Sequence, residues 1–235
     1  MKKFTVRIAV IKQETPTIKS FLLEYGTQAF HHLPGQWINL SVEINGKMES
    51  SGYSMTSSPL QQGMFQLAIK QGTHNPVTRY MYETAKAGDN VTVSNGQGVF
   101  IFERGMGNKV VLIGAGVGVT PLMSLLRYID QAAPEVDTTL LYSIPSPEEF
   151  LFREELAEIS SRNPHIHCVA TVTQQNPKGW QGATGRIDKA MLKKAGLGAE
   201  ALYYLCGPQA MIEDVDKELG KLGIPDSRIV YEKWW

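Results

Sequence analysis

The chain has 235 residues, of which 43% are hydrophobic and 20% charged, and its 23 basic side chains equal its 23 acidic ones. This length allows one large domain or two small ones, and the apolar fraction is enough to form a core. The formal net charge of zero argues against a general affinity for nucleic acid or anionic membranes, because both need a basic excess. The two cysteines, Cys168 and Cys206, are too few for a disulfide framework or an all-cysteine metal site, so we expect a reducing, cytoplasmic setting.

The amino-terminal residues carry no long apolar stretch, so we do not expect a secretory signal. The longest uncharged run lies between Lys109 and Arg127 and approaches the length of a membrane span. Several glycines and Pro121 interrupt it, which favours a strand, a glycine turn and the start of a helix. We therefore expect no membrane span.

The first part of the chain has the pattern of β structure. Phe4, Val6, Ile8 and Val10 alternate with polar residues, which predicts a half-buried strand. Further strand-like runs, separated by turn signals, lie at 20–25, 37–44, 52–56, 64–70 and 90–94. One helix is expected at 76–85, because a proline is tolerated in the first helical turn. Six strands and one helix predict a small antiparallel β-barrel over residues 1–105.

Strands and helices then alternate. The expected strands lie at 109–114, 138–143, 165–173, 202–206 and 228–235, and the expected helices at 120–132, 147–160, 188–195 and 208–222. Such alternation predicts an α/β domain with a parallel sheet over residues 106–235. Basic residues are in slight excess in the first part of the chain, which fits a domain that holds an anionic cofactor.

A glycine-rich turn follows the strand at 109–114 and opens the next helix, with the sequence Gly114-Ala115-Gly116-Val117-Gly118-Val119-Thr120-Pro121. Glycines let backbone N–H groups approach a phosphate, and a helix N-terminus adds partial positive charge. The ordinary dinucleotide fingerprint fails, because Val119 replaces its third glycine and no acidic residue ends the next strand. The alternative interpretation is a tight strand-to-helix turn without a ligand.

Three further motifs lie where a ligand could bind. Cys206-Gly207-Pro208 ends a predicted strand, and ligands bind at the carboxyl ends of parallel strands, although an isolated cysteine is more often structural. In the barrel part, Tyr53 offers a flat ring and Ser54 a short hydrogen-bonding group, or they belong to an ordinary strand and turn. The chain ends in Trp234 and Trp235, which we expect to stack on a ligand or to pack in a core or interface.

These features together resemble the ferredoxin–NADP reductase family of flavin-dependent oxidoreductases, over almost the whole chain. The matching stretches, in the order and spacing of the family, are Pro34-Gly35-Gln36-Trp37, Gly52-Tyr53-Ser54, Gly116-Val117-Gly118-Val119-Thr120-Pro121, Cys206-Gly207-Pro208 with Met211, and Tyr231-Glu232-Lys233-Trp234. The resemblance implies a flavin-binding barrel followed by a nucleotide-binding α/β domain.

The resemblance also implies cofactors and the residues that bind them. FAD is expected, with FMN as an alternative, together with NADH or NADPH. The flavin would be bound by Tyr53, Ser54, Ile69, Lys70, Val77, Thr78 and Trp234. The nicotinamide nucleotide would be bound by Gly116, Gly118, Thr120, Pro121, Thr173, Cys206, Gly207, Pro208 and Met211.

The implied chemistry is hydride transfer from the nicotinamide C4 to the flavin N5. Ser54 would hydrogen-bond near N5, Cys206 would lie near C4, and Glu232 would orient the nicotinamide or Ser54, so these three are the expected catalytic residues. Trp234 would cover the open face of the flavin and move aside for the nicotinamide. We expect no metal, because no cysteine or carboxylate cluster joins His31-His32 or the pair His165 and His167.

Two positions depart from the family pattern. Ser51 replaces an arginine that pairs with a cofactor phosphate, which leaves open a weakly held, exchangeable flavin unless Lys70 or Arg79 supplies the charge. Thr173-Gln174 stands where NADPH-using relatives have a Ser-Arg pair for the 2′-phosphate, so NADH is the expected donor.

The electron acceptor is not visible in the sequence, and the shortage of cysteines places it on another chain or in a small molecule. The chain is expected to act as a reductase component of an electron-transfer system. The alternatives are an NAD(P)H:flavin reductase that uses flavin as a substrate, which Ser51 favours, and a non-catalytic electron-transfer or regulatory subunit.

Overall fold

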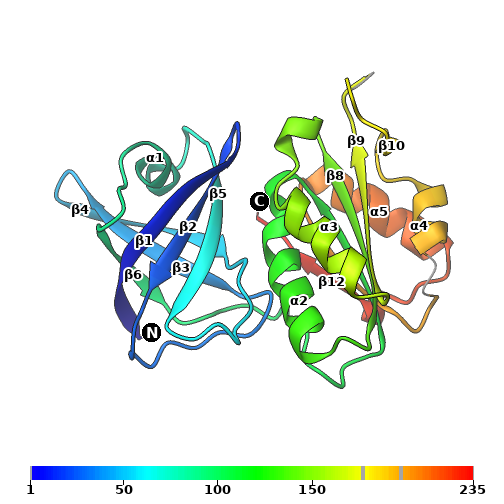
Figure 1. Cartoon of the computed structure of the whole chain (residues 1–235), viewed down its shortest axis with the longest axis horizontal. Coiled ribbons are helices and arrows are strands. Elements are labelled where there is room, and N and C mark those ends of the chain that lie inside the picture. The colour runs from blue at the N-terminus through cyan, green and yellow to red at the C-terminus, as the bar shows by residue number, and fades with distance from the viewer. Residues whose placement is uncertain (1, 176–177, 196–197, 235) are drawn as a thin grey trace.

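A computed structural model describes residues 2–175, 178–195 and 198–234. The chain forms two domains that lie side by side, a β-barrel and an α/β domain (Figure 1). The last strand of the first sheet ends at Ser94 and the first strand of the second begins at Lys109, so the boundary expected at residue 105 falls in the segment between them.

The first domain is the antiparallel barrel that the sequence predicts. Its strands are β1 (Lys3–Thr15), β2 (Ile18–Glu24), β3 (Trp37–Ile44), β4 (Lys47–Ser54), β5 (Met64–Lys70) and β6 (Asn90–Ser94). They pair in the order β4-β3-β6-β1-β2-β5, and an isolated bridge between Met55 and Leu67 joins the two ends of the sheet. Closure in this way removes most exposed strand edges.

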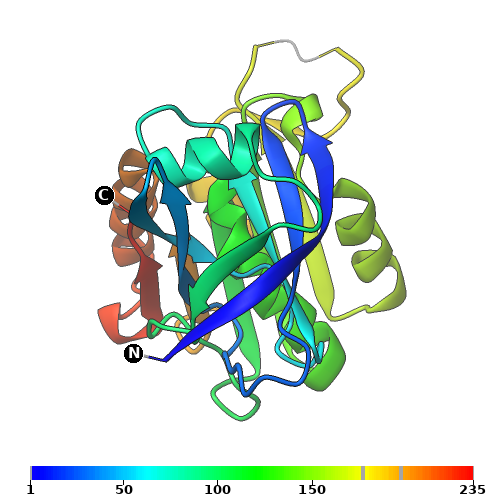
Figure 2. The ribbon, with the colours of Figure 1, turned by 90° about the vertical axis from the view of Figure 1, so that its left-hand side faces the viewer.

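Alternation of side chains fills the barrel. On β1, Phe4, Val6 and Ile8 are buried while Lys3, Thr5 and Arg7 are exposed, as the period of two requires. The expected alternation does not extend to Val10, which is 50% exposed, because the pairing register of β1 shifts between Ile8 and Val10. The helix α1 (Pro76–Glu83) lies across one end of the barrel (Figure 2) and contributes buried Val77 and Met81 to its core. The predicted helix is two residues longer at its carboxyl end than the observed one.

The second domain has a six-stranded parallel sheet. Its strands are β7 (Lys109–Ala115), β8 (Asp137–Ile144), β9 (Ile166–Val172), β10 (Ala183–Thr184), β11 (Leu202–Cys206) and β12 (Ile229–Glu232), in the order β10-β9-β8-β7-β11-β12. The helices are α2 (Val119–Ala132), α3 (Arg153–Arg162), α4 (Lys189–Ala195) and α5 (Gln209–Lys221). Helices α2 and α3 cover one face of the sheet, and α4 and α5 cover the other. This arrangement buries the central strands on both faces.

The structure corrects several details of the sequence prediction. The strand expected over 52–56 runs over Lys47–Ser54, because the turn at Asn45-Gly46 lets the chain pair with β3 from Lys47 onward. The single helix expected over 147–160 is broken into a 3-10 turn at Pro147–Glu149 and α3, because Leu151 turns into the core and Phe152 takes a left-handed backbone with φ of 60°. The two-residue strand β10 was not predicted. The last strand ends at Glu232 rather than at the terminus, and Trp235 lies outside the described residues.

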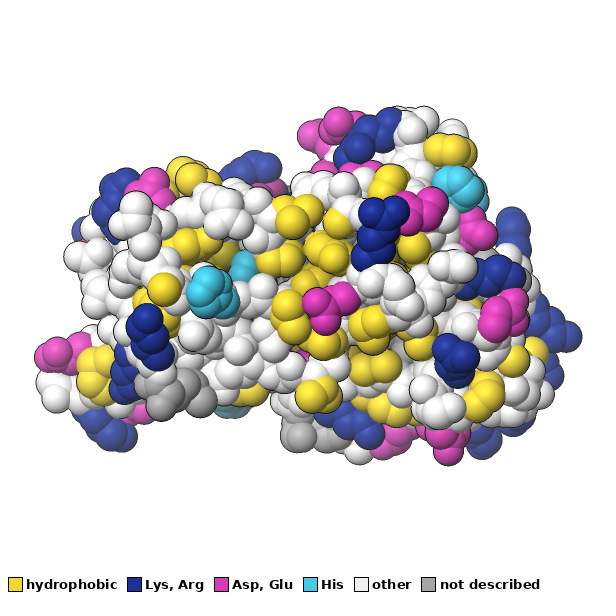
Figure 3. Space-filling model, turned by 90° about the horizontal axis from the view of Figure 1, so that it is seen from below, with side chains coloured by type: hydrophobic (Ala, Val, Ile, Leu, Met, Phe, Trp, Pro, Cys, Tyr) yellow, Lys and Arg dark blue, Asp and Glu magenta, His cyan; other side chains and the backbone are white. Residues whose placement is uncertain are grey.

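The helix α2 lies between its own sheet and the barrel (Figure 1). Seen from below, apolar side chains gather near the middle of the molecule, with only a few charged side chains among them (Figure 3). Within the part of the chain that the structure describes, no helix combines the length and the apolar character needed to cross a bilayer.

Candidate functional site

A cavity of about 670 Å³ lies between the two domains, and both domains line it. Most of the residues predicted from the sequence meet in its wall. They are Tyr53, Ser54, Ile69, Lys70, Thr78, Gly116, Gly118, Thr120, Thr173, Cys206, Gly207, Pro208, Met211 and Trp234. These residues come from seven separated segments, so the fold alone brings them together.

The barrel side of the cavity is built around the end of β4. Ser54 is buried there, and the Tyr53 hydroxyl lies 2.8 Å from Thr78 Oγ1 on α1, so the phenol is fixed in place. Burial raises the pKa of the Tyr53 phenol, which therefore stays protonated at neutral pH. This wall offers an aromatic ring and two hydroxyl groups to a ligand.

Ser51, the position where the family has an arginine, points toward the start of α1. Its Oγ accepts a hydrogen bond of 2.8 Å from Asn75 Nδ2, and Asn75 Oδ1 accepts from the Thr78 backbone as the helix N-cap. Of the two cations expected to replace the arginine, Lys70 lines the cavity and Arg79 is exposed on α1 outside its wall. Lys70 is therefore the better-placed partner for an anionic group on this side.

The opposite wall is formed by the turn between β7 and α2. Gly116 has a φ of 53°, and a Cβ there would meet no atom within 4 Å, so the cavity reaches its backbone directly. A Cβ on Gly118 would lie 2.5 Å from the Cys206 carbonyl oxygen, so only glycine allows the two loops to approach this closely. The Tyr142 hydroxyl donates to the Gly116 carbonyl at 3.0 Å and holds the turn. This turn and Thr120, in the first turn of α2, therefore line the cavity at the N-terminal end of the helix.

Cys206 and Glu232 are paired neighbours at the carboxyl ends of β11 and β12. Burial, reinforced by the Glu232 carboxylate, raises the pKa of the Cys206 thiol, which makes it an uncharged packing group rather than a nucleophile. Burial also raises the pKa of Glu232 to about 7. Glu232 is thus a group that can hold or release a proton near neutral pH.

Trp234 covers the rim of the cavity on the barrel side. Its side chain is 47% exposed, and its ring meets that of Trp37 edge to face with centroids 5.8 Å apart. A Cβ on Gly52 would lie 2.7 Å from the Trp234 ring, so the glycine before Tyr53 makes room for it. The partly exposed ring leaves one face available for a ligand.

Three of the predicted residues are near the cavity without lining it. Val77 packs into the barrel core, Pro121 is buried in the first turn of α2, and Glu232 lies beside Cys206 on the neighbouring strand. The described residues contain no group of three His, Cys, Asp or Glu side chains able to hold a metal ion.

The cavity also contains residues that the sequence reasoning missed. Arg186 and Asp214 lie at the nucleotide-domain end, with Arg186 Nη1 3.8 Å from Asp214 Oδ2, and both side chains are largely exposed. The segment 143–145 is the carboxyl end of β8 and the residue after it, and it lines the wall as expected at the carboxyl edge of a parallel sheet. That edge rule could have identified 143–145, whereas Arg186 follows a two-residue strand that has no clear sequence signal.

The residues present fit a flavin and a nicotinamide nucleotide. The wall is mainly apolar, with Tyr53 and Trp234 as flat aromatic surfaces, and hydroxyl groups from both domains are placed along it. The open space at Gly116 and the start of α2 suits a phosphate. Lys70 supplies a cation on the barrel side and Arg186 one on the nucleotide side.

Two family models match the chain, one for each domain. The oxidoreductase FAD-binding domain matches residues 6–102, and the oxidoreductase NAD-binding domain matches residues 112–217. A zebrafish (Danio rerio) protein named oxidoreductase NAD-binding domain-containing protein 1 is 32% identical, over the whole of this chain and 93% of its own length. The glycine betaine monooxygenase reductase subunit of Chromohalobacter salexigens is 28% identical over 94% of this chain and 61% of its own length.

Solved structures agree with these matches. The flavohem-like FAD/NAD-binding domain of nitric oxide dioxygenase from Vibrio cholerae superposes with a TM-score of 0.87 at 25% identity, covering 98% of both chains. A ferredoxin NADP+ reductase from Neisseria gonorrhoeae with bound FAD and NADP superposes with a TM-score of 0.83 at 22% identity, over 99% of this chain and 98% of its own, which supports the fold.

Proposed function

Because this chain belongs to the ferredoxin–NADP reductase-like oxidoreductases, in which an FAD-binding domain precedes an NAD-binding domain, we propose that it takes a hydride from NADH and passes electrons to a separate acceptor. The observation that carries the proposal is a cavity whose walls come from both domains and hold most of the predicted residues. When bound, the flavin supplies the chemistry, since it accepts a hydride and hands on electrons. The protein supplies orientation and a dry, shaped site.

Ser54, Cys206 and Glu232 are the proposed catalytic residues. The buried Ser54 hydroxyl offers a hydrogen bond on the barrel side, and the uncharged Cys206 thiol offers a small, polarizable surface on the nucleotide side. Glu232, with its raised pKa, would hold a proton beside Cys206 or orient the amide of the nicotinamide. Trp234 would cover the flavin from the rim and tilt to admit the nicotinamide.

We propose NADH rather than NADPH as the donor. Thr173-Gln174 brings no cation to the cavity, and the cation that the structure adds, Arg186, is accompanied by the carboxylate of Asp214 at 3.8 Å. Their opposite charges offset each other, so the pair gives little net attraction to a 2′-phosphate. Asp214→Asn should therefore raise kcat/KM for NADPH while changing that for NADH little. Glu213→Gln, a neighbouring exposed carboxylate outside the cavity wall, is the matched control.

The acceptor is proposed to be a separate protein or a small molecule. A relative at 28% identity is named as the reductase subunit of a monooxygenase, which supports a role as a reductase component. The two cysteines leave no set of ligands for an iron–sulfur cluster of this chain's own. The cytoplasmic location stays a prediction that rests on the same low cysteine content.

A second candidate, a reductase of free flavin, is favoured by the surroundings of Ser51. Its hydroxyl is engaged with Asn75 and brings no positive charge, so Lys70 is the cation that lines the barrel side of the cavity. A charge-assisted bond contributes about 1.5–3 kcal/mol, so the loss of one such bond lowers flavin affinity by roughly 10- to 100-fold. This weaker retention also leaves FAD and FMN as alternatives.

An absorbance spectrum of the purified protein, recorded before and after adding NADH and then NADPH under anaerobic conditions, tests the proposal. A yellow sample that NADH bleaches supports the reductase component. A colourless sample that oxidises NADH only when flavin is added supports the flavin reductase. A protein that neither binds flavin nor oxidises NADH would refute both and leave the non-catalytic subunit.

Ser54→Ala separates binding from chemistry in the same assay. We expect flavin binding to persist and the rate of flavin reduction by NADH to fall by about 10-fold or more, as for the loss of one positioned hydrogen-bond donor. Ser50→Ala is the matched control, because Ser50 lies on the same strand and pairs with Ser41 away from the cavity. Equal rates in both variants would remove Ser54 from the mechanism.

A further inference from the structure

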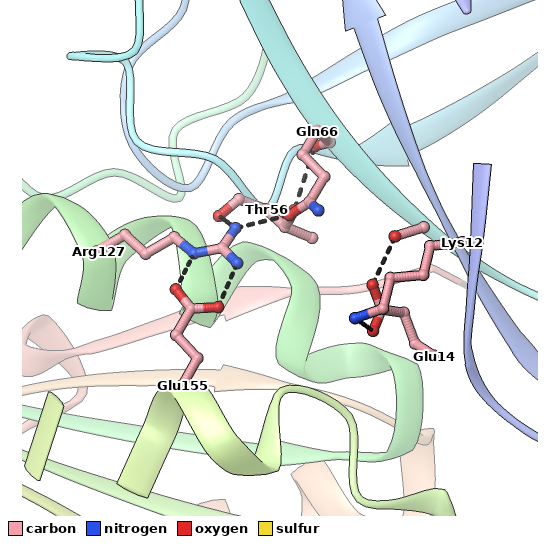
Figure 4. A network of polar contacts seen from close by, with 7 residues as sticks. Lys12, Glu14, Thr56, Gln66, Arg127 and Glu155 are labelled. Atoms are coloured by element: carbon pink, nitrogen blue, oxygen red, sulfur yellow. Dashed lines mark hydrogen bonds and ion pairs between the residues drawn. The ribbon is translucent and has the colours of Figure 1, made fainter. Parts of the chain in front are cut away.

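The side chain of Arg127, on α2, connects the two domains at a point outside the cavity wall. Its Nη1 donates to the Thr56 carbonyl oxygen and to Gln66 Oε1, both at 2.8 Å, and both acceptors belong to the barrel. Figure 4 shows Arg127 reaching between these two residues and Glu155 of α3. One guanidinium therefore contacts the barrel and both helices on this face of the α/β domain.

The Arg127 guanidinium is held in one orientation. Glu155 accepts from Nε at 2.7 Å and from Nη2 at 2.6 Å, which is a two-point ion pair within the nucleotide domain. The ring of Phe152 lies against the guanidinium, 4.8 Å from its carbon, and Phe152 is one of two described non-glycine residues with positive φ. The Arg127 side chain is only 13% exposed. Glu155 and Phe152 already fix the orientation of the Arg127 guanidinium. Its hydrogen bonds to the barrel therefore cost little additional side-chain entropy.

A second contact lies one turn earlier on the same face of α2. Ser124 Oγ accepts from the Gly35 backbone N–H at 3.1 Å and donates to the Ser57 carbonyl oxygen at 2.7 Å, and both partners belong to the barrel. Ser124 and Arg127 are three residues apart and thus share one side of the helix. Together they attach α2 to the barrel segment 56–57 and to β5.

The two elements joined by these hydrogen bonds, α2 and the barrel segment 56–57, are each continuous with one wall of the cavity. The start of α2 lines the cavity through Gly118 and Thr120, and Thr56 stands two residues after Ser54. We propose that Arg127 is a positioning residue that fixes the spacing between the flavin wall and the nicotinamide wall, and this inference rests on the proposed function. Hydride transfer needs the reacting atoms at about 3–3.5 Å, and a misplacement of about 1 Å can cost 100-fold in rate. A fixed attachment at this point is therefore expected to control the rate.

The first test needs no cofactor. The Gly35 amide donates across the domain interface, so its hydrogen exchange reports how often the barrel and α2 separate. In Arg127→Ala we expect exchange at Gly35 to become about tenfold faster or more, while the Tyr25 amide, bonded to Gly63 inside the barrel, is unchanged. Arg7→Ala is the control variant, because it also removes an arginine–glutamate ion pair, and that pair lies entirely within the barrel.

The second test measures the chemistry. In stopped-flow reduction with saturating NADH, Arg127→Ala should lower the limiting rate by about 10- to 100-fold with a smaller change in KM, because geometry is lost rather than binding. The long-wavelength charge-transfer absorbance of the stacked rings should weaken in parallel. Arg127→Lys keeps the charge but loses the planar, two-point geometry of the guanidinium. It should therefore retain only part of the limiting rate and of the charge-transfer absorbance.

Gln66→Met is a second variant, for the case in which Arg127→Ala does not fold. It removes one hydrogen-bond acceptor of Arg127 on the barrel and leaves the Arg127–Glu155 ion pair intact. It should show the same changes as Arg127→Ala, but smaller. Unchanged Gly35 exchange in both variants, or unchanged limiting rates with faster exchange, would overturn the proposal. If the wild type does not reduce flavin at all, the proposed function fails, and Gly35 exchange still decides whether Arg127 holds the two walls together.

Discussion

The raised pKa of Glu232 makes stability depend on pH in a way that one substitution isolates. Burial raises this pKa from 4.5 to about 7 in the folded protein. The folded state therefore binds more protons than the unfolded chain between these two values, and the free energy of unfolding falls as pH rises from 4.5 to 7. Glu232→Gln removes the ionisation and with it this loss of stability.

The magnitude follows from the size of the shift. For a fully buried group with such a shift, ionisation would lower the free energy of unfolding by about 3 kcal/mol. Glu232 keeps part of its surface in solvent, as does the neighbouring Trp234, so screening reduces the expected difference to about 1–2 kcal/mol. We expect Glu232→Gln and the wild type to be equally stable at pH 4.5 and the variant to be more stable by this amount above pH 7.

Urea unfolding of the flavin-free protein from pH 4.5 to 8 measures this difference, with Glu213→Gln as an exposed carboxylate control on α5. For Glu213→Gln, the difference in free energy of unfolding from the wild type should not increase as the pH rises. A difference that stays constant across the range, or that changes below pH 4.5 instead, would show that Glu232 titrates as an ordinary carboxylate and would remove its role as a proton-holding group near Cys206.

The other predictions concern the cavity walls. Gly118→Ala should weaken NAD+ binding by about tenfold or more, measured by titration, because its Cβ would lie 2.5 Å from the Cys206 carbonyl oxygen, whereas Gly220→Ala, with open space around it, should not. Trp234→Ala should lower flavin retention or change the rate of NADH oxidation, and no change in either would contradict its covering role. Ser51→Arg should tighten flavin binding by roughly 10- to 100-fold in a fluorescence titration, and Ser51→Ala should not, since it adds no charge.

Local patterns in the sequence were enough to predict most of the fold. Alternation on β1 and the turn residues between strands predicted the six strands of the barrel, and the change to alternating strands and helices predicted the parallel sheet. These signals are readable because side-chain periodicity and turn chemistry depend on neighbours in the chain. The break of the helix expected at 147–160 was not readable, because it depends on Leu151 finding a place in the core.

The sequence likewise predicted the flavin and nucleotide motifs, since Tyr53-Ser54, the turn around Gly116 and Cys206-Gly207 are short segments whose residue types carry the chemistry. Only the tertiary structure decided which other residues join them. Arg186 and Arg127 are ordinary charged residues in the sequence, one near a two-residue strand and the other on a helix. Their roles depend on segments far apart in the chain, and packing of the two domains against each other, rather than any local preference, brings those segments together.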